Sequence, residues 1–174
     1  VPGPDGKVVE VNLDFECLEN LSRIARQDYG LAGAVQHGAS TLPRDLFNKF
    51  PELETAEIHL ATDFQNMIYD NELFPEDFKK EIYVHLRKKF ASEKKETDTD
   101  EQFIYKTRKK GFGEFKSKFW ELSNEIRTEI GSHLQKKVEH LFTQLKVKDT
   151  LEVTKRTTPL VKVPPILAQE IASA

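Results

Sequence analysis

The sequence predicts an α/β fold in its first part and a helical arrangement in its second part. Two short apolar stretches, residues 31–36 and 56–61, have the composition of strands buried on both faces of a parallel sheet. Helical patterns precede, separate and follow these stretches, and this alternation favours right-handed crossovers between parallel strands. Beyond residue 74 the apolar residues recur at three- and four-residue spacings, which is the pattern of amphipathic helices.

The elements of the first part follow from capping residues and periodicity. Asp14 is a suitable N-cap for a helix that ends near Gln27. A short helix is expected over residues 44–50, between the two strands. After the second strand, a helix is expected to begin at Thr62 or Asp63.

The second part reads as helices joined by polar segments. Helices are expected over residues 78–90, 102–110 and 115–145, and the charged stretch 92–100 is expected to be a loop. The segment 147–174 contains three prolines among apolar residues and predicts an irregular tail.

Composition limits the classes of function. The 174 residues carry a formal net charge of −3, which gives no electrostatic reason to expect a nucleic-acid partner. No apolar run approaches the roughly 18 residues of a membrane span, and a single cysteine fits a reducing compartment. We therefore expect a cytoplasmic protein with neither a nucleic-acid nor a membrane partner. Because the chain begins at Val1 and its one methionine is Met67, an upstream segment is also expected.

The functional signal lies where the two predicted strands end. His37 closes the first strand and is followed by Gly38-Ala39-Ser40, and the second strand closes with Ala61-Thr62. An imidazole is a metal ligand, and small residues expose backbone NH groups to a phosphate. In the alternative interpretation His37 is a hydrogen-bonded core histidine and Gly38 a turn residue.

These residues carry a family resemblance. His37-Gly-Ala-Ser-Thr-Leu-Pro43 resembles the His-Gly-Gly-Ser segment of class II, metal-dependent fructose-bisphosphate aldolases, and residues 57–65 resemble the next strand of that family. Residues 98–110 are similar to a longer bacterial branch of it. The resemblance implies that residues 1–74 are the C-terminal part of a (β/α)8 TIM barrel, that 75–146 are a helical extension packing on the barrel, and that 147–174 are the tail.

The resemblance also implies an activity, the reversible aldol cleavage of a ketose-bisphosphate such as fructose 1,6-bisphosphate to dihydroxyacetone phosphate and an aldehyde. A divalent metal, usually Zn²⁺, polarises the substrate carbonyl in this family, and His37 matches one of its ligands. The remaining ligands and the acidic proton-transfer groups would lie in the missing N-terminal half of the barrel, and a homo-oligomer is expected. The positions that match the substrate phosphate site are Gly38, Ser40, Ala61 and Thr62.

Three positions depart from the family pattern. Ala39 replaces the commoner second glycine, and Ala61 stands where many members have aspartate. His59 occupies the position of an asparagine that contacts the reacting substrate. We assign His59 as a catalytic residue, with a structural role or metal ligation as the alternatives.

Other interpretations stay open at this point. A second substrate phosphate could be bound by basic residues of the second part, namely Arg108, Lys106 and Lys109. Alternatively, these residues are solvated charges on a helix. A tagatose bisphosphate would suit the same metal and phosphate groups. The chain would alternatively be a non-catalytic helical interaction or assembly fragment derived from an aldolase, an interpretation that rests on the three departures and on the long helical second part.

Overall fold

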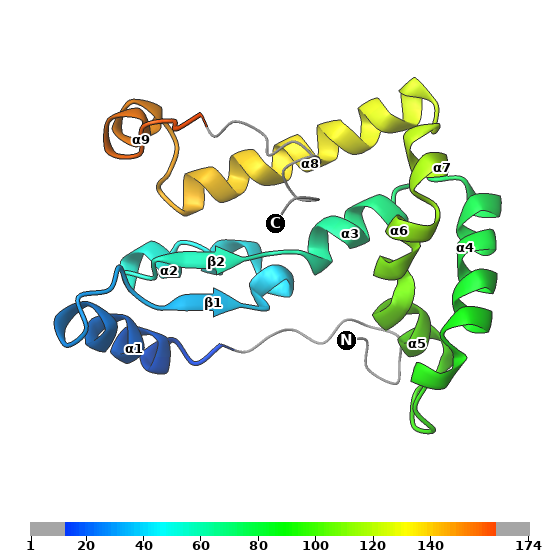
Figure 1. Ribbon diagram of the computed structural model, residues 1–174, viewed down its shortest axis with the longest axis horizontal. Helices are drawn as coiled ribbons and strands as arrows, with labels where there is room; N and C mark the ends of the chain where they lie inside the picture. Colours follow the sequence, from blue (N-terminus) through cyan, green and yellow to red (C-terminus); the bar gives the residue numbers. More distant parts are fainter. Residues whose placement is uncertain (1–12, 163–174) are drawn as a thin grey trace, which may run out of the picture.

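The computed structural model describes residues 13–162, and most of their regular structure is helical (Figure 1). The strands are β1 (Val35–His37) and β2 (Glu57–His59). The α-helices are α1 (Phe15–Gln27), α2 (Lys49–Glu52), α3 (Thr62–Tyr69), α4 (Glu76–Lys89), α5 (Asp100–Thr107), α6 (Gly111–Glu114), α7 (Lys116–Trp120), α8 (Asn124–Gln144) and α9 (Leu151–Thr157). Short 3-10 helices are η1 (Ala39–Thr41), η2 (Arg44–Leu46), η3 (Ala91–Glu93) and η4 (Arg108–Lys110).

The two strands lie side by side in parallel, as the helix–strand alternation predicted. Their register places Val35 opposite Glu57 and His37 opposite His59. The prediction that this region is part of a (β/α)8 barrel is wrong, because the sheet in residues 13–162 has only these two strands, of three residues each. The end residues of both strands are exposed and only the middle ones are half-buried, whereas barrel strands are buried on both faces.

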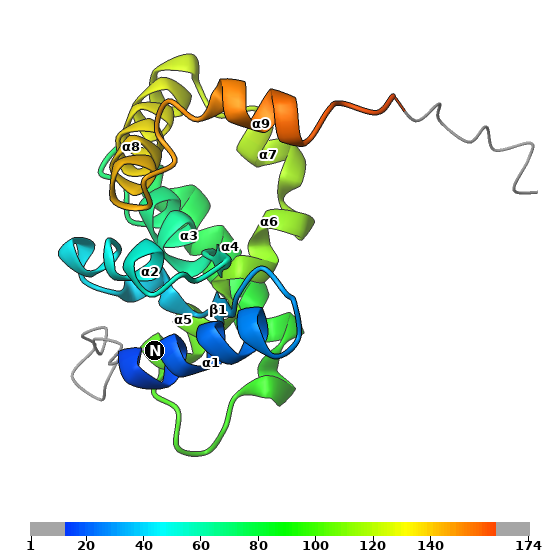
Figure 2. The ribbon, with the colours of Figure 1, turned by 90° about the vertical axis from the view of Figure 1, so that its left-hand side faces the viewer.

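Helix packing determines the fold class because the apolar residues gather between helices. One cluster, hereafter the aromatic cluster, has Tyr69, Phe74, Ile82, Leu86, Phe103, Ile104 and Ile130 as its buried members. The other, hereafter the strand-side cluster, has Leu18, Ala39, Leu42, Phe47, Phe50 and Leu141. Helix α8 contributes to both clusters, and α3 packs against it (Figures 1 and 2).

The helix boundaries confirm some predictions and correct others. The Asp14 side chain caps α1 by accepting a hydrogen bond from the Cys17 backbone N–H at 2.9 Å, as expected. The single helix predicted over 115–145 is instead two, because Ser123 caps a new helix by accepting from the Ile126 N–H. Part of the predicted irregular tail is α9, and residues 163–174 lie outside the described residues. Within residues 13–162 no helix combines the length and apolar character needed to cross a bilayer.

Candidate functional site

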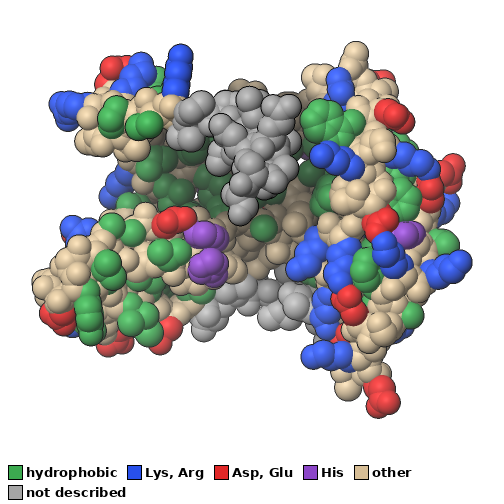
Figure 3. Space-filling view, viewed as in Figure 1, with side chains coloured by type: hydrophobic (Ala, Val, Ile, Leu, Met, Phe, Trp, Pro, Cys, Tyr) green, Lys and Arg blue, Asp and Glu red, His purple; other side chains and the backbone are tan. Residues whose placement is uncertain are grey.

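The parallel pairing of β1 and β2 brings two histidines together. His37 and His59 are register partners, their ring centroids are 4.2 Å apart, and the ring planes are tilted by 38°. Figure 3 shows adjacent histidine side chains on the surface where the two strands end. Both residues are exposed, so His37 is not the buried core histidine of the alternative interpretation.

Glu57 orients the ring of His59. Its Oε1 lies 2.6 Å from His59 Nε2, on the same strand and two residues away, so both side chains are on one face of β2. An ionised carboxylate only accepts hydrogen bonds, so Nε2 is the protonated nitrogen when the His59 ring is neutral. The lone pair of His59 is then on Nδ1. A carboxylate partner of this kind fixes the tautomer of histidines that bind metals or transfer protons.

The loops that follow the strands are joined by Ser40. Its Oγ accepts a hydrogen bond from the Ala61 backbone N–H at 3.0 Å, and the residue is 6% exposed. Gly38 makes the turn into η1 with a φ of 77°, a left-handed conformation that favours glycine, although a Cβ there would meet nothing within 4 Å. Backbone conformation, not lack of space, therefore favours glycine at this position.

The second of these loops leads directly into α3. Thr62 is the first residue of the helix, and Ala61 makes no side-chain hydrogen bond as its N-cap. The first N–H groups of a helix have no partner inside the helix and carry the positive end of its dipole. The start of α3 is therefore suited to an anion.

A pocket of about 590 Å³ opens between the strand ends and these loops. Every residue predicted for the site lines it, together with three that were not predicted: Glu57, Ile58 and Leu60. The histidine pair and the start of α3 thus face one space. The structure thus brings together the residues of the two motifs that the sequence places at strand ends.

The donor atoms fit a zinc ion in part. Two imidazoles, with a carboxylate behind one of them, belong to the ligand types that zinc prefers. Among residues 13–162 no group of three or more His, Cys, Asp or Glu side chains is arranged to hold a metal. A zinc ion bound at His37 would complete its shell with water, substrate or groups outside these residues.

Two charged residues that matter to this region were not found from the sequence. Lys137 of α8 is buried, and its Nζ is 2.7 Å from Oδ2 of Asp63 in the first turn of α3. Asp63 follows Thr62 directly. No short-range pattern links a lysine in α8 to this loop, because the contact depends on how α8 packs on α3.

Arg108, considered for a second phosphate, does not line the pocket. It is 6% exposed, its Nη1 is 2.7 Å from Asp70 Oδ1, and its guanidinium lies over the rings of Tyr69 and Tyr105. Burial is the largest single effect on the pKa of Arg108 and lowers it. Hydrogen bonding to Asp70 and the other favourable contacts together outweigh burial, so the pKa lies above its ordinary value. Arg108 is neither a solvated helix charge nor a phosphate ligand in this structure.

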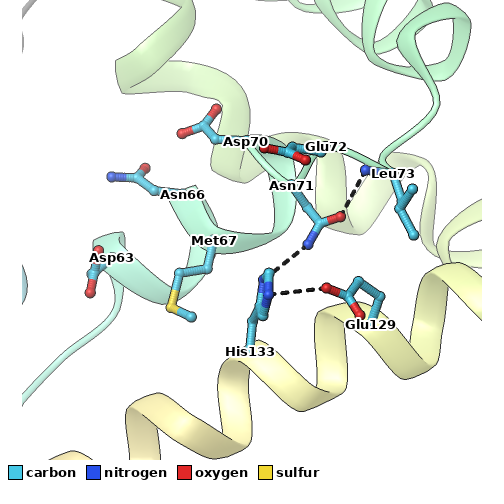
Figure 4. A pocket seen from close by; sticks show the side chains of 9 residues that line it. All are labelled: Asp63, Asn66, Met67, Asp70, Asn71, Glu72, Leu73, Glu129 and His133. Atoms are coloured by element: carbon cyan, nitrogen blue, oxygen red, sulfur yellow. Dashed lines mark hydrogen bonds and ion pairs between the residues drawn. The ribbon is translucent and has the colours of Figure 1, made fainter.

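A second pocket, of about 540 Å³, lies between α3 and α8 (Figure 4). Three of its polar residues, Asn71, Glu129 and His133, are linked by side-chain contacts through His133. His133 pairs with Glu129 at 3.1 Å and lies 3.3 Å from the Asn71 amide nitrogen, while Asn71 Oδ1 accepts from the Leu73 N–H. These contacts connect the turn after α3 with α8, and a structural role is sufficient to explain them.

The geometry defines a class of site, an exposed histidine pair beside the N-terminus of a helix. Comparison of the chain with protein-family models, with curated proteins and with solved structures found no match.

Proposed function

We propose that this chain supplies the metal-binding histidine and the phosphate-binding loops of a metal-dependent lyase that cleaves a ketose-bisphosphate. One observation carries the proposal. The strand register places His37 beside His59, and the loops that follow the two strands are joined by the Ser40–Ala61 hydrogen bond, so that the residues proposed to bind metal and those proposed to bind phosphate line one pocket.

The phosphate of the substrate is assigned to the loops. Gly38, Ser40 and Thr62 line the pocket, and we assign the phosphate to the first N–H groups of α3 together with the hydroxyls of Ser40 and Thr62. The Ser40 Oγ already accepts from Ala61, which leaves its own proton to donate to a phosphate oxygen. Binding here would orient the sugar so that its carbonyl end lies toward the histidines.

The histidines are assigned to the reacting end. His37 would hold the metal, which when bound supplies Lewis-acid polarisation of a carbonyl. His59 would act on the substrate, because Nε2–H of its neutral ring donates a hydrogen bond to the Glu57 carboxylate and Nδ1 is left as the proton acceptor, in a ring packed beside that of His37. Glu57 is thus the positioning residue for His59.

The proposal includes partners and a place of action. The further metal ligands and the acid–base partner are assigned to a segment upstream of the described residues or to a second copy of the chain. The single cysteine supports action in the reducing cytoplasm.

A second candidate, a non-catalytic assembly module, is supported by exposed apolar residues. Phe142 of α8 is 51% exposed, and Leu151 and Val153 of α9 are 63% and 51% exposed. Exposed apolar side chains on α8 and α9 would suit a contact with another protein. The two candidates differ in whether metal, phosphate and turnover depend on the pocket.

The test uses the native protein with any polypeptide that accompanies it. Intact mass, zinc content and cleavage of fructose 1,6-bisphosphate are measured for the wild type, for His37→Ala and for the control His140→Ala, which removes an imidazole that contacts the Arg44 carbonyl outside the pocket. We expect about one zinc per protomer and turnover in the wild type and the control, and loss of both in His37→Ala. Thr62→Ala should retain zinc and bind phosphate more weakly. Unchanged zinc content in His37→Ala would refute the metal assignment, and a zinc-free, inactive wild type would favour the assembly module.

A further inference from the structure

A lysine is buried close to the proposed phosphate site. Lys137 is 4% exposed, although lysine is almost never fully buried unless it is paired. Its Nζ forms an ion pair with Asp63 and lies 5.5 Å from the centroid of the Phe47 ring. Burial of an ammonium group is costly, and a buried ion pair often stabilises a fold no better than apolar residues of similar size. Stability alone therefore explains this pair poorly.

The position of Asp63 suggests what the pair does. It is the second residue of α3, directly after Thr62, and a carboxylate in the first turn is favourable for the helix dipole. The same negative charge opposes an anion at the start of α3. Lys137 lies against this carboxylate at 2.7 Å and offsets its charge.

Lys137 also contacts the segment that follows the other strand. Phe47 comes directly after η2, between β1 and β2, and is completely buried in the strand-side cluster. The lysine therefore touches elements downstream of both loops that form the pocket. Figure 4 shows Asp63 where the chain enters α3, on the wall of the second pocket.

We propose that Lys137 determines the charge selectivity of the pocket: by neutralising Asp63, it lets the start of α3 accept a phosphate dianion. This inference rests on the proposed function, since it concerns the same phosphate site. Lys137 does not line that pocket, so it acts through Asp63 and is a positioning residue, not a ligand.

The proposal predicts a specific pattern in a double-mutant cycle. Lys137→Met leaves the Asp63 charge without compensation, and its repulsion of the anion at an effective dielectric constant near 20 should weaken phosphate binding about 10- to 100-fold. Asp63→Asn should bind phosphate at least as tightly as the wild type. The double variant Asp63→Asn/Lys137→Met, in which the pair is uncharged, should return to within about threefold of the wild type.

The experiment is calorimetric titration of the full chain with inorganic phosphate at fixed ionic strength, with zinc content measured on the same samples. Lys136→Met is the matched control, because it removes the same charge from the adjacent, exposed position of α8 and should leave the affinity unchanged. Thermal unfolding checks that each variant is folded. If Lys137→Met does not fold, weaker phosphate binding by Asp63→Asn or by the neutral pair still refutes the proposal, and tighter binding by Asp63→Asn than by the neutral pair supports it.

The outcomes distinguish failure of the charge role of Lys137 from failure of the proposed function. If the wild type binds phosphate but Lys137→Met and the double variant are equally weak, or both are unaffected, the charge role is wrong and the proposed function stands. Weakening in Asp63→Asn would likewise refute it, because a purely structural clamp predicts that result. If the wild type binds zinc but no phosphate, the proposed phosphate site itself is wrong and this inference falls with it.

Discussion

Replacing Ser40 by alanine separates the structural and the ligand-binding roles of the pocket loops. The Ser40 hydroxyl is buried and accepts the Ala61 N–H at 3.0 Å. Without it, that N–H loses its partner, which costs about 1–3 kcal/mol of unfolding free energy. For a chain of 150–250 residues each kcal/mol changes Tm by about 2–4 °C, so we expect a decrease of about 2–12 °C.

The same substitution removes a hydroxyl that would donate to the phosphate. A hydrogen bond to a charged group contributes about 1.5–3 kcal/mol, which corresponds to a loss of about 10- to 100-fold in phosphate affinity. Differential scanning calorimetry gives the first quantity and phosphate titration gives the second. The two measurements are made on the same preparation.

Ser22 provides a matched control. Its Oγ accepts a hydrogen bond from the Ala34 N–H at 3.3 Å, and the residue is 1% exposed. Ser22 thus makes the same kind of bond to the residue just before β1, away from the pocket. Ser22→Ala should lower Tm by a similar amount and leave phosphate affinity unchanged. Equal loss of phosphate affinity in Ser22→Ala and Ser40→Ala would show that general destabilisation is responsible, and the reasoning about the pocket would be refuted.

Two further predictions concern the helical part of the fold. A Cβ added at Gly111 would lie 2.5 Å from the hydroxyl of the buried Tyr69, so Gly111→Ala should lower the free energy of unfolding in urea by about 1–3 kcal/mol. Gly113 is on the same helix and a Cβ there would meet nothing within 4 Å, so Gly113→Ala should be neutral or slightly stabilising. Equal effects of the two substitutions would contradict the packing argument. The hydrogen bond from Arg87 lowers the pKa of Asp100 from its ordinary value of 3.8. The Asp100 carboxylate therefore stabilises the fold above that pH, and this contribution is lost as the pH falls through the lower pKa of the folded state. Asp100→Asn should make Tm less dependent on pH in this acidic range, and an unchanged dependence would argue against the ion pair.

The site was more predictable from the sequence than the fold around it. The polar residues of the pocket stand at fixed offsets from two apolar stretches, and a parallel pairing of adjacent strands is enough to bring His37 and His59 together. The continuous apolar composition of those stretches also suggested burial on both faces. The structure has only three residues in each strand, and Val35 is 46% exposed.

The helical arrangement could be predicted only in part, for physical reasons. Periodicity located α4 and α8, but it could not show that the chain turns at Ser123, because the apolar spacing continues across the break. The Lys137–Asp63 contact is set by the packing of α8 on α3. Such long-range contacts leave no local pattern in the sequence.

The contribution of α8 to both apolar clusters has a consequence for the order of folding. The strand-side cluster holds Ala39 and is completed by Leu141, so it cannot be fully assembled until the chain has been synthesised past that residue. Contacts between distant parts of a chain form late, since the intervening segment must first be ordered. A nascent chain that ends before α8 would carry both histidines without the support that shapes the pocket, and ligand binding would mark the final stage of folding.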